Sequence, residues 1–211
     1  MMQSQSTPLS RALSGESASG TATPLKALEI GRQRWLMCER ISMGPIAEEL
    51  GINRATLFRW VGNRELFVGE IIWSFYQDLI DKTRTRTEGQ GPEYVVAVLE
   101  YLLRKLVGSE LMQHFIRQDP EYAIRVLTSK SSLVQSRSVA MVEELMAEQA
   151  AKTDWTPPIN EKDLAFLLIR VGESFLYGDV ISGQATDIAQ TTMAFRLLLS
   201  GHARNQGGPG Q

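Results

Sequence analysis

The strongest structural signal in the chain lies at residues 46–64, which read IAEELGINRATLFRWVGNR. Two short helical segments, 45–50 and 53–61, are separated there by Gly51. A steep crossing of two helices needs a small residue, here Ala47, where the backbones touch, and a tight turn needs a residue that tolerates a positive φ, here Gly51. Apolar residues suited to a shared core follow in order: Ile46, Leu50, Ile52, Leu57 and Trp60. The stretch predicts a helix-turn-helix, with a bare pair of crossed helices as the alternative.

The charge of the second helical segment favours a nucleic-acid target. Residues 53–64 contain Arg54, Arg59 and Arg64 and no acidic residue, so their local charge is +3, whereas the whole chain carries −2. A helix that enters the major groove needs cations for phosphates and donors for base edges. These residues predict binding to double-stranded DNA. A helical adaptor that uses the same motif for protein contacts remains the alternative function.

Length and composition describe a globular protein. The chain has 211 residues, of which 43% are hydrophobic and 22% charged, enough for one large or two small domains. A single cysteine, Cys38, excludes an intrachain disulfide and multi-cysteine metal sites. It is expected to be a small buried residue of the first helix. Because the sequence shows neither an export signal nor an apolar run of about 20 residues, we expect a cytoplasmic protein with no membrane partner.

Helical periodicity dominates the rest of the chain, and no segment reads convincingly as a strand. The longer helical segments are expected at 24–40, 63–84, 93–107, 131–152, 161–181 and 186–199, with shorter ones near 109–117 and 120–129. The predicted fold is therefore all-α, with about nine helices. A three-helix helix-turn-helix head precedes a larger C-terminal helical bundle.

The stretch at 47–65 resembles the DNA-binding head of TetR-family transcriptional regulators, and the resemblance extends over 24–72. It implies a homodimer that binds a near-palindromic operator and is released by a small-molecule effector. It also implies that Arg54 and Thr56 contact phosphates or bases, that Arg59 reads a base, and that Arg64 holds a phosphate at a helix start. Trp60 is expected at a phosphate or in the core. The full expected DNA-binding set is Asn53, Arg54, Ala55, Thr56, Arg59, Trp60 and Arg64.

Composition at the two ends and the resemblance between them divide the chain into four segments. They are a disordered leader at 1–23, a DNA-binding domain at 24–72, a ligand-binding and dimerisation domain at 73–200, and a flexible tail at 201–211. The last two helices are expected to form a four-helix dimer interface with a second copy. Packing of these helices within one chain is the alternative.

The effector pocket is expected among the central helices. Candidates are polar, aromatic or adaptable residues in apolar surroundings: Tyr101, His114, Phe115, Tyr122, Met141, Arg170, Glu173, Phe175 and Tyr177. Arg170 either pairs with Glu173 three residues later or anchors a ligand, and His114 either is a satisfied core or surface histidine or lines the pocket. Residues 118–123 and 173–177 resemble the QsdR-type branch of the family, which governs breakdown of lactones and quorum signals. A γ-lactone or acyl-homoserine lactone is therefore the expected effector.

Enzyme classes find little support in this sequence. It contains no nucleophile elbow, no phosphate-cradling glycine loop, no dinucleotide fingerprint and no zinc-binding His-Glu-x-x-His helix. Two histidines and one cysteine leave little for a catalytic constellation. We expect a protein that is not an enzyme and that needs neither a cofactor nor a metal ion.

Overall fold

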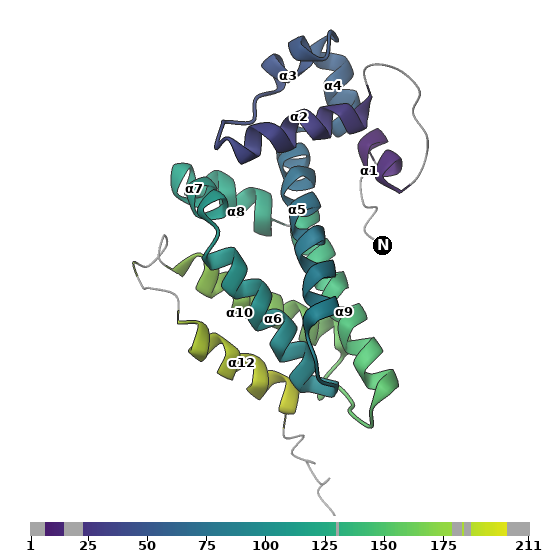
Figure 1. Ribbon diagram of the computed structural model, residues 1–211, viewed down its shortest axis with the longest axis vertical. Helices are drawn as coiled ribbons and strands as arrows, with labels where there is room; N and C mark the ends of the chain where they lie inside the picture. Colours follow the sequence, from purple (N-terminus) through teal and green to yellow (C-terminus); the bar gives the residue numbers. More distant parts are fainter. Residues whose placement is uncertain (1–6, 15–22, 130, 179–182, 184–186, 202–211) are drawn as a thin grey trace, which may run out of the picture. The chain divides into compact units, whose positions relative to one another are not determined.

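The computed structural model describes residues 7–14, 23–129, 131–178, 183 and 187–201. Eleven helices and no strand occur in these residues, which confirms the all-α prediction and exceeds the expected helix number (Figure 1). The helices are α1 (Pro8–Leu13), α2 (Pro24–Leu36), α3 (Met43–Glu49), α4 (Arg54–Val61), α5 (Arg64–Arg86), α6 (Gly91–Val107), α7 (Glu110–Gln118), α8 (Pro120–Thr128), α9 (Leu133–Lys152), α10 (Glu161–Leu176) and α12 (Ile188–Ser200).

Backbone contacts divide the chain into two compact units, and each is described by itself. The head unit comprises Met1–Leu79 and Ser109–Ser136. It therefore holds α1 to α4, the first part of α5, and α7 and α8. The bundle unit comprises Ile80–Gly108 and Arg137–Gln211, which hold α6, α10, α12 and most of α9.

The helix-turn-helix is formed by α3 and α4, which pack against each other. Gly51 has a φ of +65°, so the turn uses the left-handed backbone that glycine adopts without strain. The Asn53 side chain accepts a hydrogen bond from the Thr56 amide at 2.7 Å and thereby caps α4. At the start of α5, Asn63 accepts one from the Leu66 amide at 2.8 Å. Both polar caps fix where the helix that follows begins.

The core of the head unit is apolar and closely packed. Ile46 and Leu57 are fully buried, as the sequence predicted, and Val61 joins them. Leu50, Ile52 and Trp60 are only partly buried, so their assignment to the core was wrong in part: each lies at the edge of the short motif, where few neighbours cover it.

Close packing of α2 against α5 in the head unit explains why α2 has a glycine at position 31. A Cβ placed on Gly31 would lie 2.5 Å from Cδ1 of Ile71, so the two helices approach too closely for a side chain there. Gly31 itself is buried.

Two expectations about the N-terminal region were wrong. Part of the expected disordered leader forms α1, in which Leu9 is fully buried and Thr7 caps the helix, because one leucine here finds an apolar site between α2 and α4. Residues 1–6 and 15–22 lie outside the described residues, as does 202–211 of the expected flexible tail. Cys38 is exposed rather than buried, because α2 ends at Leu36 and Cys38 follows with a φ of +57°.

The bundle unit is built on α6, which packs against α10 and α12 (Figure 1). Its apolar positions are buried: Val95, Val96, Val98, Leu99, Leu102 and Leu103. Polar contacts close the ends, since the buried Gln149 accepts a hydrogen bond from the Gly91 amide and the Trp155 indole donates to the Leu199 carbonyl. The helix expected over 161–181 ends at Leu176, where the Tyr177 amide closes the last turn and Gly178 follows. No helix in the described residues has the length and apolar character needed to cross a membrane.

Candidate functional site

The expected DNA-contacting residues of α4 lie on its outer side. Asn53, Arg54, Ala55 and Arg59 are exposed, and Thr56 and Trp60 are partly exposed. In contrast, Leu57 and Val61 are fully buried in the head core. This division follows from the helical period, because residues three and four apart share a face. The helix therefore presents a polar, basic face without losing its packing.

The electrostatics around α4 suit an anionic partner. Arg59 makes no ion pair with any residue that the structure describes, and the Arg54 guanidinium lies 5.7 Å from the centre of the Phe58 ring. The acidic residues of α3 are elsewhere engaged or exposed: Glu49 forms an ion pair with Arg34 at 2.8 Å, and Glu48 faces solvent. The basic charge of the second helix is thus not neutralised within the motif.

A hollow of about 320 Å³ lies beside α4 in the head unit. Three arginines, Arg40, Arg54 and Arg64, line it together with Phe58, and no acidic residue does. Three cations facing one open hollow provide the donors that phosphate oxygens accept. Sequence reasoning identified Arg54 and Arg64 but missed Arg40, because Arg40 lies in the irregular segment between α2 and α3, outside the motif.

Arg64 has protein partners that the sequence did not indicate. Its Nε donates a hydrogen bond to the Ile41 carbonyl at 2.8 Å, and its guanidinium lies 4.2 Å from the centre of the Tyr122 ring on α8. A guanidinium carries five N–H donors, so these contacts leave others for an anion. The expected phosphate contact of Arg64 thus stays a prediction, and Arg64 in addition ties the start of α5 to α8.

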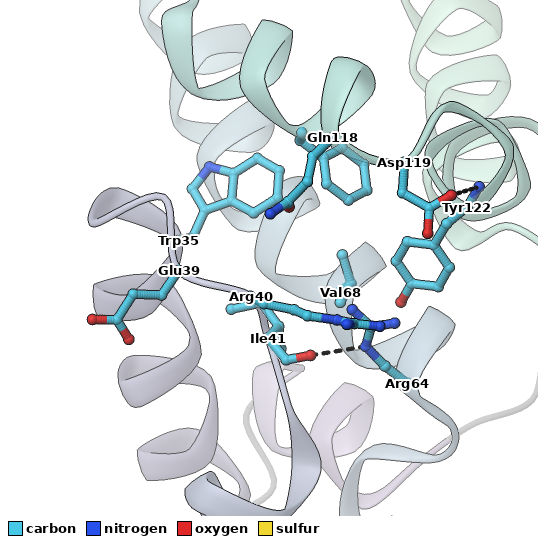
Figure 2. A pocket seen from close by; sticks show the side chains of 10 residues that line it. Trp35, Glu39, Arg40, Ile41, Arg64, Val68, Gln118, Asp119 and Tyr122 are labelled. Carbon is cyan, nitrogen blue, oxygen red and sulfur yellow. Dashed lines mark hydrogen bonds between the residues drawn. The ribbon is translucent and has the colours of Figure 1, made fainter.

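A second pocket lies within the head unit, between the end of α2, the start of α5, and α7 and α8 (Figure 2). Three aromatic residues line it: Trp35, Phe115 and Tyr122. Four charged residues line it as well: Glu39, Arg40, Arg64 and Asp119. Phe115 and Tyr122 were among the expected effector residues, and the structure brings them together here. The other members were missed because residues 35–41 meet residues 115–122 only through tertiary packing.

The remaining effector candidates do not line this pocket. On α6, Tyr101 is half-buried with Lys105 5.3 Å from its ring centre, and on α9 Met141 is buried in the bundle core. His114 is exposed on α7, in keeping with a surface histidine. At the end of α10, Tyr177 is buried and Phe175 half-buried. An effector role for these residues stays a prediction.

Arg170 and Glu173 form the ion pair that their spacing allows. Arg170 donates to Glu173 at 2.8 Å, and the two side chains are 48% and 13% exposed. Burial raises the pKa of Glu173 to about 7, although the charge of Arg170 acts in the opposite direction. The structure thus shows the ion-pair alternative at Arg170, and it places the arginine itself at the surface.

Comparisons with known proteins agree with this architecture. Residues 90–200 match a family model described as Tetracyclin repressor-like, C-terminal domain. The fold is similar to a solved structure of the R. erythropolis transcriptional repressor QsdR from the TetR family, with 26% sequence identity and a TM-score of 0.78 over 88% of this chain and 97% of that one. It also resembles the fatty acid degradation regulator FadR from Bacillus halodurans, at 15% identity and a TM-score of 0.52 over 89% and 99% of the two chains.

No curated protein sequence gives a significant match. The family model nevertheless covers more than half of the chain, and the similarity to QsdR extends over the head as well. The helix-turn-helix, its exposed basic face and the matched C-terminal domain occur together in one regulator family that is not known for enzymes. The chain belongs to the TetR family of transcriptional regulators.

Proposed function

We propose that this regulator is a repressor that binds a near-palindromic operator as a homodimer and leaves it when a small apolar effector binds. The observation that carries the proposal is the outer face of α4, where Arg54 and Arg59 are exposed and form no ion pair with an acidic residue that the structure describes. Such a face fits the major groove, in which phosphates need cations and guanine edges need paired donors. A regulator that binds chromosomal DNA would act in the cytoplasm.

Within this proposal the residues divide into two roles. Arg59 lies on the exposed side of α4 and would bond a guanine edge, with Asn53, Ala55, Thr56 and Trp60 around it. Arg54, Arg64 and Arg40 line the basic hollow and would hold phosphates. Base contacts specify the sequence, whereas phosphate contacts position the protein on any sequence.

Dimerisation would use the outer side of α10 and α12. Large apolar side chains are exposed on these two adjacent helices: Phe166, Leu167, Met193 and Leu197. Exposed apolar clusters of this kind mark interaction sites in soluble proteins. A second copy of the chain is the proposed occupant, because two copies related by a two-fold axis present two recognition helices to two half-sites.

The effector would act by shifting a population of dimers. A ligand weakens operator binding if it binds better to dimers in which the spacing of the heads does not match the operator half-sites. The operator then weakens ligand binding by the same factor. The resemblance at residues 118–123 and 173–177 to a branch that governs lactone breakdown favours a lactone. The bundle helices α6, α9 and α10 carry Tyr101, Met141 and Glu173, which we propose as part of that effector site.

The DNA roles are tested by comparing Arg59→Ala with Arg64→Ala in fluorescence anisotropy on a selected operator and on variants of it. Arg59→Ala is expected to lose about 1–3 kcal/mol on the best site and to relax specificity at one base pair. Arg64→Ala should weaken all sequences similarly and reduce the salt slope by about one.

Two controls support the comparison. Arg104→Ala removes an exposed arginine of the bundle unit and is expected to leave DNA binding unchanged. Arg64→Lys retains the charge while losing the Ile41 contact, which separates phosphate binding from the fold. Unchanged binding by both alanine variants would contradict the DNA role of α4 and favour the adaptor function.

A further inference from the structure

The pocket of the head unit shown in Figure 2 contains a buried polar group with no partner. The Tyr122 side chain is 5% exposed, and its hydroxyl has no hydrogen-bond partner among the described residues. Figure 2 shows this hydroxyl directed into the pocket. An unsatisfied buried hydroxyl is costly, so such groups in native proteins usually mark a missing water or ligand. Burial also raises the pKa of Tyr122 to about 12, so the hydroxyl stays a neutral donor at alkaline as well as neutral pH.

Two arginines and two acidic residues line the pocket, but no ion pair joins them in the described part of the chain. Asp119 is engaged, because it accepts a hydrogen bond from the Tyr122 amide at 3.1 Å and caps α8. Glu39 lies 3.8 Å from Arg34, which is not part of the pocket. Arg64, in contrast, bonds only a neutral carbonyl and faces an aromatic ring, and Arg40 has no ion pair in the described part of the chain. Both guanidinium groups reach into the pocket in Figure 2.

The remaining walls are aromatic. The rings of Trp35 and Phe115 lie 5.0 Å apart between centroids and are tilted by 56°. Phe115 and Tyr122 are 6.2 Å apart and meet edge to face. Rings in such contact offer flat, polarisable surfaces against which another ring packs favourably. The pocket holds about 140 Å³, close to the roughly 150 Å³ of an engineered protein cavity that binds one benzene molecule.

Charge, donors, walls and size point to the same ligand class. We propose that this pocket is a binding site for a single-ring aromatic carboxylate. The ring would pack among Trp35, Phe115 and Tyr122. The carboxylate would accept hydrogen bonds from the Tyr122 hydroxyl and the free N–H groups of Arg40 and Arg64, because a carboxylate has acceptor sites for several donors.

This site is distinct from the effector site proposed in the bundle unit, and it can be tested in the absence of operator DNA. All of its residues belong to the head unit. It also differs from a lactone site, since a neutral lactone has no carboxylate to pair with the free N–H groups of Arg40 and Arg64.

The test is isothermal titration of the full chain with benzoate, in the absence of DNA. We expect one benzoate per chain. Benzyl alcohol, which retains the ring without the charge, and acetate, which retains the charge without the ring, should each bind at least about tenfold more weakly.

Variants locate the site. Tyr122→Phe removes the hydroxyl alone and Arg40→Gln removes an exposed cation, and each should weaken benzoate binding by about tenfold. The matched control is Arg125→Gln, because Arg125 also lies near Tyr122, at 5.7 Å from its ring centre, yet does not line the pocket. Its affinity should stay within about twofold of the native chain. No benzoate binding by the native chain, or equal affinity in all three variants, would overturn the proposal.

Discussion

The helices of the head unit and of the bundle unit are stabilised in different ways. In the head, helices of seven and eight residues are held by particular side chains: Gly51 makes the turn, and Asn53 and Asn63 cap the helices that follow. In the bundle, α6 and α10 run for 17 and 16 residues and are stabilised by many apolar contacts. A short helix is marginally stable alone and depends on particular caps and turn residues. In a long, packed helix, a leucine can be exchanged for another apolar residue of similar volume at little cost.

The chemistry of the two units therefore indicates their binding partners to different degrees. The basic face of α4 and the arginine-lined hollow indicate an anionic partner by their charge. The bundle shows instead an exposed apolar face on α10 and α12, whose chemistry indicates a partner surface but no particular effector. Substitutions in each unit test this difference.

The largest effect on operator affinity is expected from a change at the exposed apolar face of α10 and α12. Leu197→Asp places a charge at a side chain that is 66% exposed and should convert the proposed dimer to a monomer. Operator affinity should then fall by about 10²- to 10⁴-fold, because the second half-site no longer binds as part of the same particle. Sedimentation and anisotropy measure the two effects. Leu36→Asp, at a leucine of the head that is 56% exposed, is the matched control and should leave the dimer intact. A Leu197→Asp chain that remains dimeric would contradict the proposed interface.

The next effect concerns the core of the head. Leu57→Ala empties a fully buried position and should lower the free energy of unfolding by about 2–5 kcal/mol, measured by urea denaturation. Phe58→Ala changes the adjacent residue, which is 37% exposed, and should cost less than about 1 kcal/mol. Similar losses for the two variants would mean that the packing of α4 differs from the structure.

The head unit also shows what could and could not be predicted from sequence. The order of Ile46, Ala47, Gly51 and Leu57 sufficed for the helix-turn-helix, because the spacing of core residues in two crossed helices is local. The all-α class followed from periodicity in the same way. Arg40 could not be found, since its place beside Arg54 and Arg64 depends on the path of an irregular segment.

Contacts between distant segments were equally inaccessible. The sequence suggested Phe115 and Tyr122 as ligand residues but not their neighbour Trp35, which lies 80 residues before Phe115. Likewise, α1 depends on one buried leucine, Leu9, in an otherwise polar leader, and composition alone hides so small an apolar contribution.

A smaller effect is expected at the end of α10. Burial raises the pKa of Glu173 from 4.5 to about 7, so between those pH values the folded chain holds a proton that the unfolded chain has released. The free energy of unfolding should therefore fall as pH rises through this range, by at most about 1.4 kcal/mol per pH unit, and level off above pH 7. Glu173→Gln should remove this component. Parallel denaturation profiles of the two chains between pH 5 and 8 would contradict the burial of Glu173.

The smallest expected effect links the two anion sites of the head. Arg40 and Arg64 line both the basic hollow and the aromatic pocket, so a bound benzoate would compete with DNA phosphate for their N–H groups. Saturating benzoate should weaken operator binding by about fivefold, and operator should weaken benzoate binding by the same factor. Arg40→Gln should reduce both changes. An operator affinity that saturating benzoate leaves unchanged, or a coupling that Arg40→Gln leaves intact, would contradict a role for the shared arginines.

The central claim is that the head reads DNA, and selection of genomic fragments by the purified full chain tests it most directly. The best fragment is then titrated against salt. We expect a near-palindromic site with half-sites about one helical turn apart, and an affinity that falls steeply as salt rises. No enriched sequence, or binding that is insensitive to salt, would contradict it.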